Sequence, residues 1–332
     1  MSSVELALLT LDEATAAQVR PVLAWLREHG DPDSPGLLAT YLSAALPSWY
    51  GGDDREQHDL AWALGDLYES AGRSEQAALC RAGSTHERLA AWHWIRSFPD
   101  VTAAFWQPAL TALHRRSDPP ERVSLPLSST RALLAAVGDG LLLTPGGELP
   151  PGTVRALDDR FRWTEEFPWL RGDGEADIPP LRFLHQHALA QRLLEHHGDR
   201  LVRTRTGEAC LHDTARLWHA VVDPAPRWSQ HFERDALGVM AASVLRSADF
   251  TLGRIGEEVA HVLAAKWRPA ARDSIFDGAS LVAQAWYQLG VPLGWWDTGR
   301  GPADRRPSTF GRAAAVAVFR AVAGPAAGAG LR

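Results

Sequence analysis

The sequence predicts a mainly α-helical protein, with an N-terminal domain of helical hairpins followed by winged-helix-like modules that carry short β-hairpins. Two patterns predict this fold class. Over the first 120 residues, apolar side chains recur every three or four positions between glycine and proline breaks, which is the spacing of amphipathic helices. Beyond them one unit recurs: an apolar helix, a tight turn, a short strand and a Ser/Thr-x-x-Gly sequence that begins another helix.

The first elements are amphipathic helices with recognisable ends. Asp12 is a favoured N-cap residue, and the helix that it begins should end at Gly30. A second helix is predicted over 37–46 and should end at Pro47, because proline cannot donate the backbone hydrogen bond that continues a helix. Further helices are expected up to residue 115.

One helical hairpin is predicted at 61–81. Its small and aromatic residues fall at the offsets of a single tetratricopeptide unit, with the small residues at the helix contact and at the turn. These residues are Trp62, Gly65, Tyr68, Gly72 and Ala77. A single unit is a hairpin and not a solenoid, so generic helix packing is the main interpretation and a peptide-binding groove is the alternative.

Three domains are predicted: a helical domain at 1–120, a winged-helix-like domain at 121–265 and a C-terminal winged-helix-like module at 266–332. The first boundary rests on the helix-breaking run Ser117 to Pro120. The second rests on charge, because residues 266–332 contain nine basic and four acidic residues in a chain whose net charge is -6.

The recurring unit has three copies, whose hydroxyl and glycine residues are Thr144 with Gly147, Thr204 with Gly207, and Ser308 with Gly311. Each hydroxyl is expected to cap a helix by accepting a hydrogen bond from the glycine amide three residues on. In the first copy, Pro145 would occupy the first helical position. Winged-helix folds use this order of helix, turn, strand and cap to join their second or third helix to the wing.

The middle of the chain also carries a family resemblance. The residues that carry it are Leu143-Thr144, Gly147, Pro150-Pro151, Trp169, Pro179-Pro180, the segment Leu201 to Gly207, and Leu217-Trp218. From about residue 130 to 265 the sequence resembles the helical, winged-helix-like region of actinobacterial plasmid pRiA ORF-three-like proteins. The small α/β domain that names those proteins has no counterpart here. The resemblance implies a fold and no activity.

Composition and motifs exclude several function classes. No apolar run approaches the roughly 20 residues that span a bilayer, and no signal peptide is evident, so a cytoplasmic protein is expected. The sole lysine, Lys266, does not follow a glycine, so there is no phosphate-binding P-loop. Zinc-protease, dinucleotide-binding and serine-hydrolase signatures are also missing. The sequence therefore predicts no catalytic residues and no cofactor, and it leaves open whether the chain is an enzyme.

The histidines are the residue type that suggests a metal. Five of them gather around one predicted helix and its strand, close to Cys210; they are His185, His187, His196, His197 and His212. At 100° per residue they do not converge on one face of that helix. We therefore expect no metal site.

The C-terminal module holds the strongest candidate site. On the helix 275–289, Asp277, Ser280, Gln284, Tyr287 and Gln288 form a polar half, opposite Leu281, Val282, Ala285, Trp286 and Leu289. The following hairpin carries Arg300, Arg305 and Arg306, with Arg312 at the next helix start. Such a helix and basic tip could contact base edges and phosphates of DNA. Trp295 and Trp296 should point to opposite faces of a strand, which predicts that one of them is exposed or at an interface.

Two functional hypotheses follow. The first is a regulatory or scaffold protein whose C-terminal module binds DNA or a protein partner, with the oligomeric state left open, a homodimer included. The alternative is a natural-product tailoring enzyme or a small-ligand-binding protein. Its pocket would be lined by Trp169, Trp218 and Trp228, with His185 or His219.

Overall fold

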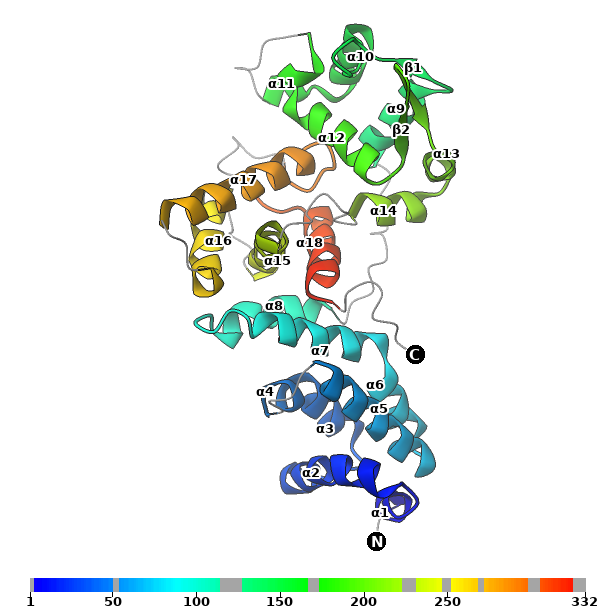
Figure 1. Cartoon of the computed structure of the whole chain (residues 1–332), viewed down its shortest axis with the longest axis vertical. Coiled ribbons are helices and arrows are strands. Elements are labelled where there is room, and N and C mark those ends of the chain that lie inside the picture. Colours follow the sequence, from blue (N-terminus) through cyan, green and yellow to red (C-terminus); the bar gives the residue numbers. More distant parts are fainter. Residues whose placement is uncertain are drawn as a thin grey trace. The chain divides into compact units, whose positions relative to one another are not determined.

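The computed structural model of the chain is mainly helical, with one small antiparallel sheet (Figure 1), which confirms the predicted fold class. It describes residues 3–49, 54–113, 127–166, 173–222, 231–246, 252–267, 272–297 and 305–324. The chain forms two compact units, residues 1–99 with 323–332 and residues 100–322. In the described ranges, no helix is long and apolar enough to cross a membrane.

The division between the units differs from the predicted domain boundary. Ser117 to Pro120 lie outside the described residues, and the chain already divides between Pro99 and Asp100. The reason is that helix α8 (Ala103–Ala112) packs against α15 (His231–Arg246), a helix of the second unit. An apolar helix belongs to the core that buries it, whichever sequence break follows it.

The first unit consists of helices joined by short turns. They are α1 (Ser3–Leu8), α2 (Glu13–His29), α3 (Pro35–Thr40), the π-helical η1 (Tyr41–Ala45), α4 (Leu46–Trp49), α5 (Asp54–Ser70), α6 (Ser74–Arg81) and α7 (Gly83–Ile95). The predicted first helix is confirmed as α2, since the Asp12 carboxylate accepts a hydrogen bond from the Thr15 amide at 3.0 Å. Gly30 is its C-cap residue.

The predicted helix end at Pro47 is wrong, because helical backbone continues through this proline to the end of α4. Pro47 has no N–H to donate to the Ser43 carbonyl four residues earlier. That carbonyl instead accepts hydrogen bonds from Arg88 Nη2 at 3.4 Å and Trp92 Nε1 at 3.3 Å, both on α7. Partners from another helix therefore satisfy the group that the proline leaves open.

The predicted hairpin at 61–81 is formed by α5 and α6. Gly65 lies where an added Cβ would be 3.1 Å from the Arg81 side chain and 3.4 Å from Cys80 Cβ, so the small residue permits the close helix contact. Gly72 has φ +72° in the turn, a conformation that favours glycine. Tyr68 is fully buried and donates a hydrogen bond to the Pro32 carbonyl at 2.8 Å.

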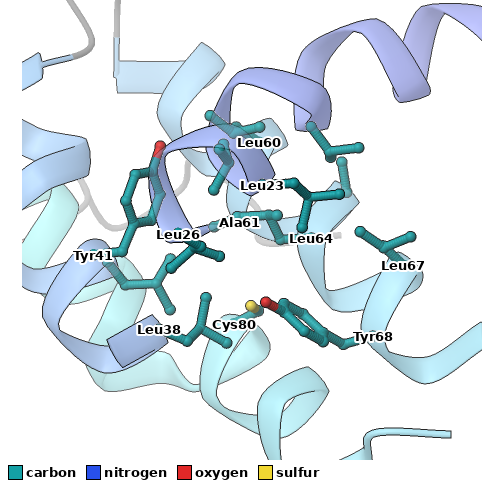
Figure 2. Packing of buried hydrophobic residues seen from close by; sticks show 14 of the residues in the cluster. Leu23, Leu26, Leu38, Tyr41, Leu60, Ala61, Leu64, Leu67, Tyr68 and Cys80 are labelled. Carbon is teal, nitrogen blue, oxygen red and sulfur yellow. The ribbon is translucent and has the colours of Figure 1, made fainter. Parts of the chain in front are cut away.

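The core of the first unit gathers leucines of α2, α3 and α5 around Tyr68 and Cys80 (Figure 2). Burial raises the pKa of the Cys80 thiol to about 12, because the thiolate would lose its hydration there. Burial also raises the pKa of Tyr68 above its usual range. Both groups are therefore held in the neutral form by the folded unit.

Alkaline pH should destabilise this unit through Cys80. The pKa of the thiol is higher in the folded than in the unfolded chain, so the contribution to stability is complete below about pH 8.5 and is lost as pH rises toward 12. By pH 10 the loss should be about 2 kcal/mol. Urea unfolding of wild type and Cys80→Ala between pH 7 and 10 measures it, and the variant should show the shallower pH dependence. Parallel curves would contradict the assignment.

The second unit contains α8 and all of the sheet. Its remaining elements are α9 (Ser128–Val137), β1 (Leu141–Leu142), α10 (Pro151–Phe161), α11 (Trp163–Glu166), the 3-10 helix η2 (Glu175–Asp177), α12 (Pro179–Ala190), β2 (Leu194–His197), β3 (Arg200–Arg203), α13 (Arg205–His212), α14 (Thr214–Val222), α15, α16 (Leu252–Lys266), α17 (Arg272–Gly290) and α18 (Thr309–Ala323).

From α9 to β3 the order of elements is that of a winged helix. Helix α9 precedes the short strand β1, α10 and α12 follow, and β2 and β3 form the hairpin in the position of the wing. The strands are antiparallel in the order β1-β3-β2, with Leu141 opposite Leu201 and His196 opposite Leu201 on the other side. The predicted winged-helix-like arrangement is therefore present in residues 128–203.

The C-terminal module differs from its predicted form. The break expected at residue 265 separates α16 from α17, and these two helices pack closely against each other and against α15. Within the described residues, the hairpin after α17 is reduced to one isolated bridge between Trp296 and Pro307. The module is thus a bundle of α15, α16 and α17 with a minimal hairpin, and hydrogen bonds from Arg234 and Arg312 link α15 and α18.

Two of the three predicted Ser/Thr-x-x-Gly caps are confirmed. The Thr204 hydroxyl accepts a hydrogen bond from the Gly207 amide at 3.0 Å, and the Ser308 hydroxyl accepts one from the Gly311 amide at 3.0 Å. In both, an added Cβ on the glycine would overlap a backbone carbonyl oxygen, that of Leu193 just before β2 or that of Trp295 just before the Trp296 bridge. The glycine is thus required for close approach of helix and strand.

The first copy of the unit is an exception. The Thr144 hydroxyl accepts from the Glu148 amide at 3.1 Å, and the Gly147 amide donates to the Thr144 carbonyl. These bonds close a tight turn, so the expectation that Pro145 begins a helix is wrong. Helix α10 begins at Pro151 instead. No strand backbone lies against Gly147, which has open space around it.

Alanine substitutions test the close approach. Gly207→Ala and Gly311→Ala should each lower the free energy of unfolding by about 2 kcal/mol, because the added methyl group forces helix and strand apart. Gly152→Ala is the matched control, since Gly152 lies in α10 with nothing near its missing Cβ. This control should be neutral or slightly stabilising. Equal unfolding midpoints for all three variants in urea would contradict the interpretation.

Candidate functional site

The polar half predicted for α17 is exposed only in part, and its Tyr287 is buried. Asp277 and Gln284 are exposed, while Ser280 and Gln288 are half-buried. In the opposite half, Val282, Trp286 and Leu289 are buried and Ala285 is half-buried. The Leu281 side chain is 67% exposed. The expectation that Leu281 belongs to the core is wrong, because it extends the exposed face instead.

Both tryptophans of the hairpin are buried, so the expectation that one is exposed is wrong. Trp295 contacts Trp286 with ring centroids 5.0 Å apart, and Trp296 contacts Tyr287 at 5.8 Å. Consecutive aromatic residues of α17 thus cover the two tryptophans. Gly290 makes room for them, since an added Cβ there would press on the Trp296 ring.

The predicted arginines differ in how far they are exposed to solvent. Arg305 is only 7% exposed, with its guanidinium 5.9 Å from the centroid of the Tyr287 ring, so the expected phosphate contact is wrong for this residue. Tyr287 is buried by the same contacts. Arg306 is exposed, whereas Arg312 is half-buried and donates to the Val244 carbonyl at 3.2 Å. Arg300 lies outside the described residues.

The third helix of the winged-helix region is covered. In helix-turn-helix proteins this helix enters the major groove, so it must present its polar side chains to solvent. Here α12 packs against α17, and its histidines His185 and His187 are buried. Only Arg182 of α12 is exposed. The contact is extended by the buried Ser129 hydroxyl, which donates to the Pro292 carbonyl at 2.6 Å.

A buried acid and base hold the entry to α12. His185 Nδ1 lies 2.7 Å from a Glu175 carboxylate oxygen, and the other oxygen accepts a hydrogen bond from the Leu149 amide at 2.7 Å. Both residues are 3% exposed. Sequence reasoning missed this pair. Its acid, Glu175, is the middle one of three acidic residues at alternate positions in 173–177, just before the two prolines that begin α12. The pair fastens η2 and the loop before α10 onto α12.

Of the other residues that suggested a metal, His196 comes near this pair, with its ring centroid 6.5 Å from that of His185. His187 Nε2 is 2.9 Å from the Val221 carbonyl, and His196 and His197 lie exposed on β2. Cys210 is buried. In the part of the chain that the structure describes, no three metal-ligating side chains come together.

Removing the acid of the buried pair should be costly. Glu175→Gln removes the buried carboxylate that His185 and the Leu149 amide contact, so the free energy of unfolding should fall by about 3 kcal/mol. Glu208→Gln removes an exposed carboxylate beside Arg203 and should cost less than about 1 kcal/mol. Urea unfolding followed by circular dichroism measures both. A loss in Glu175→Gln no larger than in this control would contradict the structural role.

An open groove of about 650 Å³ lies where α16, the start of α17 and residues 100–101 meet. Its α16 wall carries Ala260, Ala264 and Ala265, and Ile275 and Phe276 provide the α17 wall. Phe276 is 47% exposed, an unusual position for a large aromatic side chain. The charged or titratable side chains of the lining are Asp100, Glu257 and His261. Sequence reasoning missed this surface because α16 was assigned to a different domain from α17.

No protein-family model matches the chain, and no curated protein or solved structure matches it either. The resemblance to pRiA ORF-three-like proteins therefore stays a prediction. What the chain does has to be argued from its own surfaces.

Proposed function

We propose that this chain is a cytoplasmic regulatory or scaffold protein that binds a protein partner through the surface formed by α16 and α17. The groove beside Phe276 carries the proposal. Apolar surface that stays exposed next to a concave site is typical of protein interaction sites. Phe276 and Leu281 are two of the exposed large apolar side chains of the described residues, and both lie on α17.

Three observations favour a protein partner over DNA. The helix α12 is packed against α17 rather than open to a major groove. Arg305, Trp295 and Trp296, which a nucleic-acid site would need at its surface, are buried. Carboxylates line the groove, and these would repel phosphates. Gln284 and Arg306 remain exposed residues of the original DNA hypothesis, which receives less support than the protein hypothesis.

The enzyme alternative has little support in the described residues. Of the three tryptophans proposed to line a pocket, Trp169 and Trp228 lie outside the described residues, and Trp218 is 1% exposed in the core. His185 is engaged with Glu175, and His219 is exposed on α14. Of the described members of this set, Trp218 and His185 are therefore buried, and His219 faces solvent.

Site-specific photocrosslinking in cells that make the chain naturally tests the proposed function. A benzophenone amino acid at Phe276 should crosslink a defined protein, identified by mass spectrometry. The same probe at Leu142, which is 53% exposed on β1, is the matched control and should not capture that protein. Equal capture at both positions, or crosslinks to nucleic acid alone, would refute the proposal.

A further inference from the structure

The length and the lining of the groove between α16 and α17 indicate which kind of segment a partner would place there. This inference rests on the proposed function. Its α16 wall extends from Glu257 to Ala265, which corresponds to about 12 Å along a helix axis at 1.5 Å per residue. Two turns of an occupying helix fit this length. Two walls are helices and the remaining lining is the turn at 100–101, so the described lining offers no strand edge to an extended peptide.

The lining determines which side chains the occupant should bring. Ala260 and Ala264 are one helical turn apart on the α16 wall and leave room for larger side chains from the other side. Phe276 stands half-exposed at the α17 wall, where an apolar anchor would bury its ring. The occupant should therefore present aliphatic or aromatic anchors on one face.

The charges of the lining determine what should flank those anchors. Asp100 and Glu257 line the groove and Asp277 is exposed on α17 next to Phe276. In the described part of the chain, none of these three carboxylates forms an ion pair, and no lysine or arginine lines the groove. Charged groups at the rim of an interface select partners by complementarity. A basic segment would be attracted and an acidic one repelled.

We propose that this groove binds an amphipathic α-helix of a partner protein, with apolar anchors seated between Ala264 and Phe276 and with lysine or arginine beside Asp100 and Glu257. This assignment specifies the partner's chemistry: a basic, amphipathic helical segment of about two to three turns. A second copy of this chain, DNA and an acidic peptide are the competing occupants.

Peptide display against the full chain tests the proposal. The probe is a library of 18-residue helical peptides with a fixed leucine face and with Lys, Glu or Gln at each flanking position. Selection on wild type should enrich Lys beside the anchors. Selection on Ala264→Trp, which fills the groove, should lose that enrichment, whereas Ala215→Trp, at an exposed alanine of α14, should keep it.

Charge reversal then identifies the carboxylate. Fluorescence anisotropy with the selected basic peptide should show Glu257→Lys weakening binding about fivefold or more, since an attraction becomes a repulsion. Glu195→Lys changes the net charge equally at an exposed site on β2 and should change affinity less than twofold. Enrichment of Glu, no enrichment that depends on Ala264, or equal effects of the two reversals would each overturn the proposal.

The results distinguish failure of the proposed function from failure of the proposed helix binding. If the probe at Phe276 captures a partner but the library selects no basic peptide, the proposed function stands and this inference fails. If the captured partner is the chain itself, the groove is a self-association site and the inference also fails. If crosslinking and selection both give nothing that depends on the groove, both proposals fail.

Discussion

The second unit depends on a place where the start of a helix lies directly on the backbone that leads into a hairpin. A glycine at this point is in contact with a carbonyl oxygen, and the hydroxyl three residues earlier caps the helix. The Thr204 and Ser308 hydroxyls also donate to carbonyls near the preceding turn, Arg192 at 2.5 Å and Gly294 at 2.7 Å. At each site a single hydroxyl therefore bonds both to the first turn of the helix and to the turn that precedes the hairpin.

That arrangement occurs twice, and each time it follows a long helix. The turn after α12 holds Arg192 at φ +54°, and the turn after α17 holds Gly294 at φ +64°. The two helices preceding these turns pack against each other. Their contact covers α12, the surface that a DNA-binding winged helix would use, and it leaves the other side of α17 to solvent. The exposed site of this unit is therefore on α16 and α17.

Local features of the fold could be predicted from the sequence because their causes are local. The Asp12 cap, the Gly72 turn and the two hydroxyl caps each need only neighbours within a few residues. The failures have distant causes. Pro47 is accommodated by two side chains from α7, which no pattern around the proline reveals. Trp295 is buried by an aromatic residue of α17, and the period of a strand cannot report what covers each face.

The candidate site shows the same limit. The spacing of polar residues on α17 identified its exposed side, since helical periodicity is a property of one segment. The groove could not be predicted, because Glu257 and Phe276 meet only when α16 folds against α17. Sequence alone gave no reason to join helices on either side of residue 265.

The contact of α12 with α17 has a consequence for how the surface behaves in solution. If the two helices belonged to separate chains, the fraction of chains in contact would rise and fall with protein concentration, as in any bimolecular association. Here both helices belong to one polypeptide, so dilution does not separate them. The exposed face of α17 is consequently presented in the same orientation in a cell that holds few copies of the protein as in one that holds many.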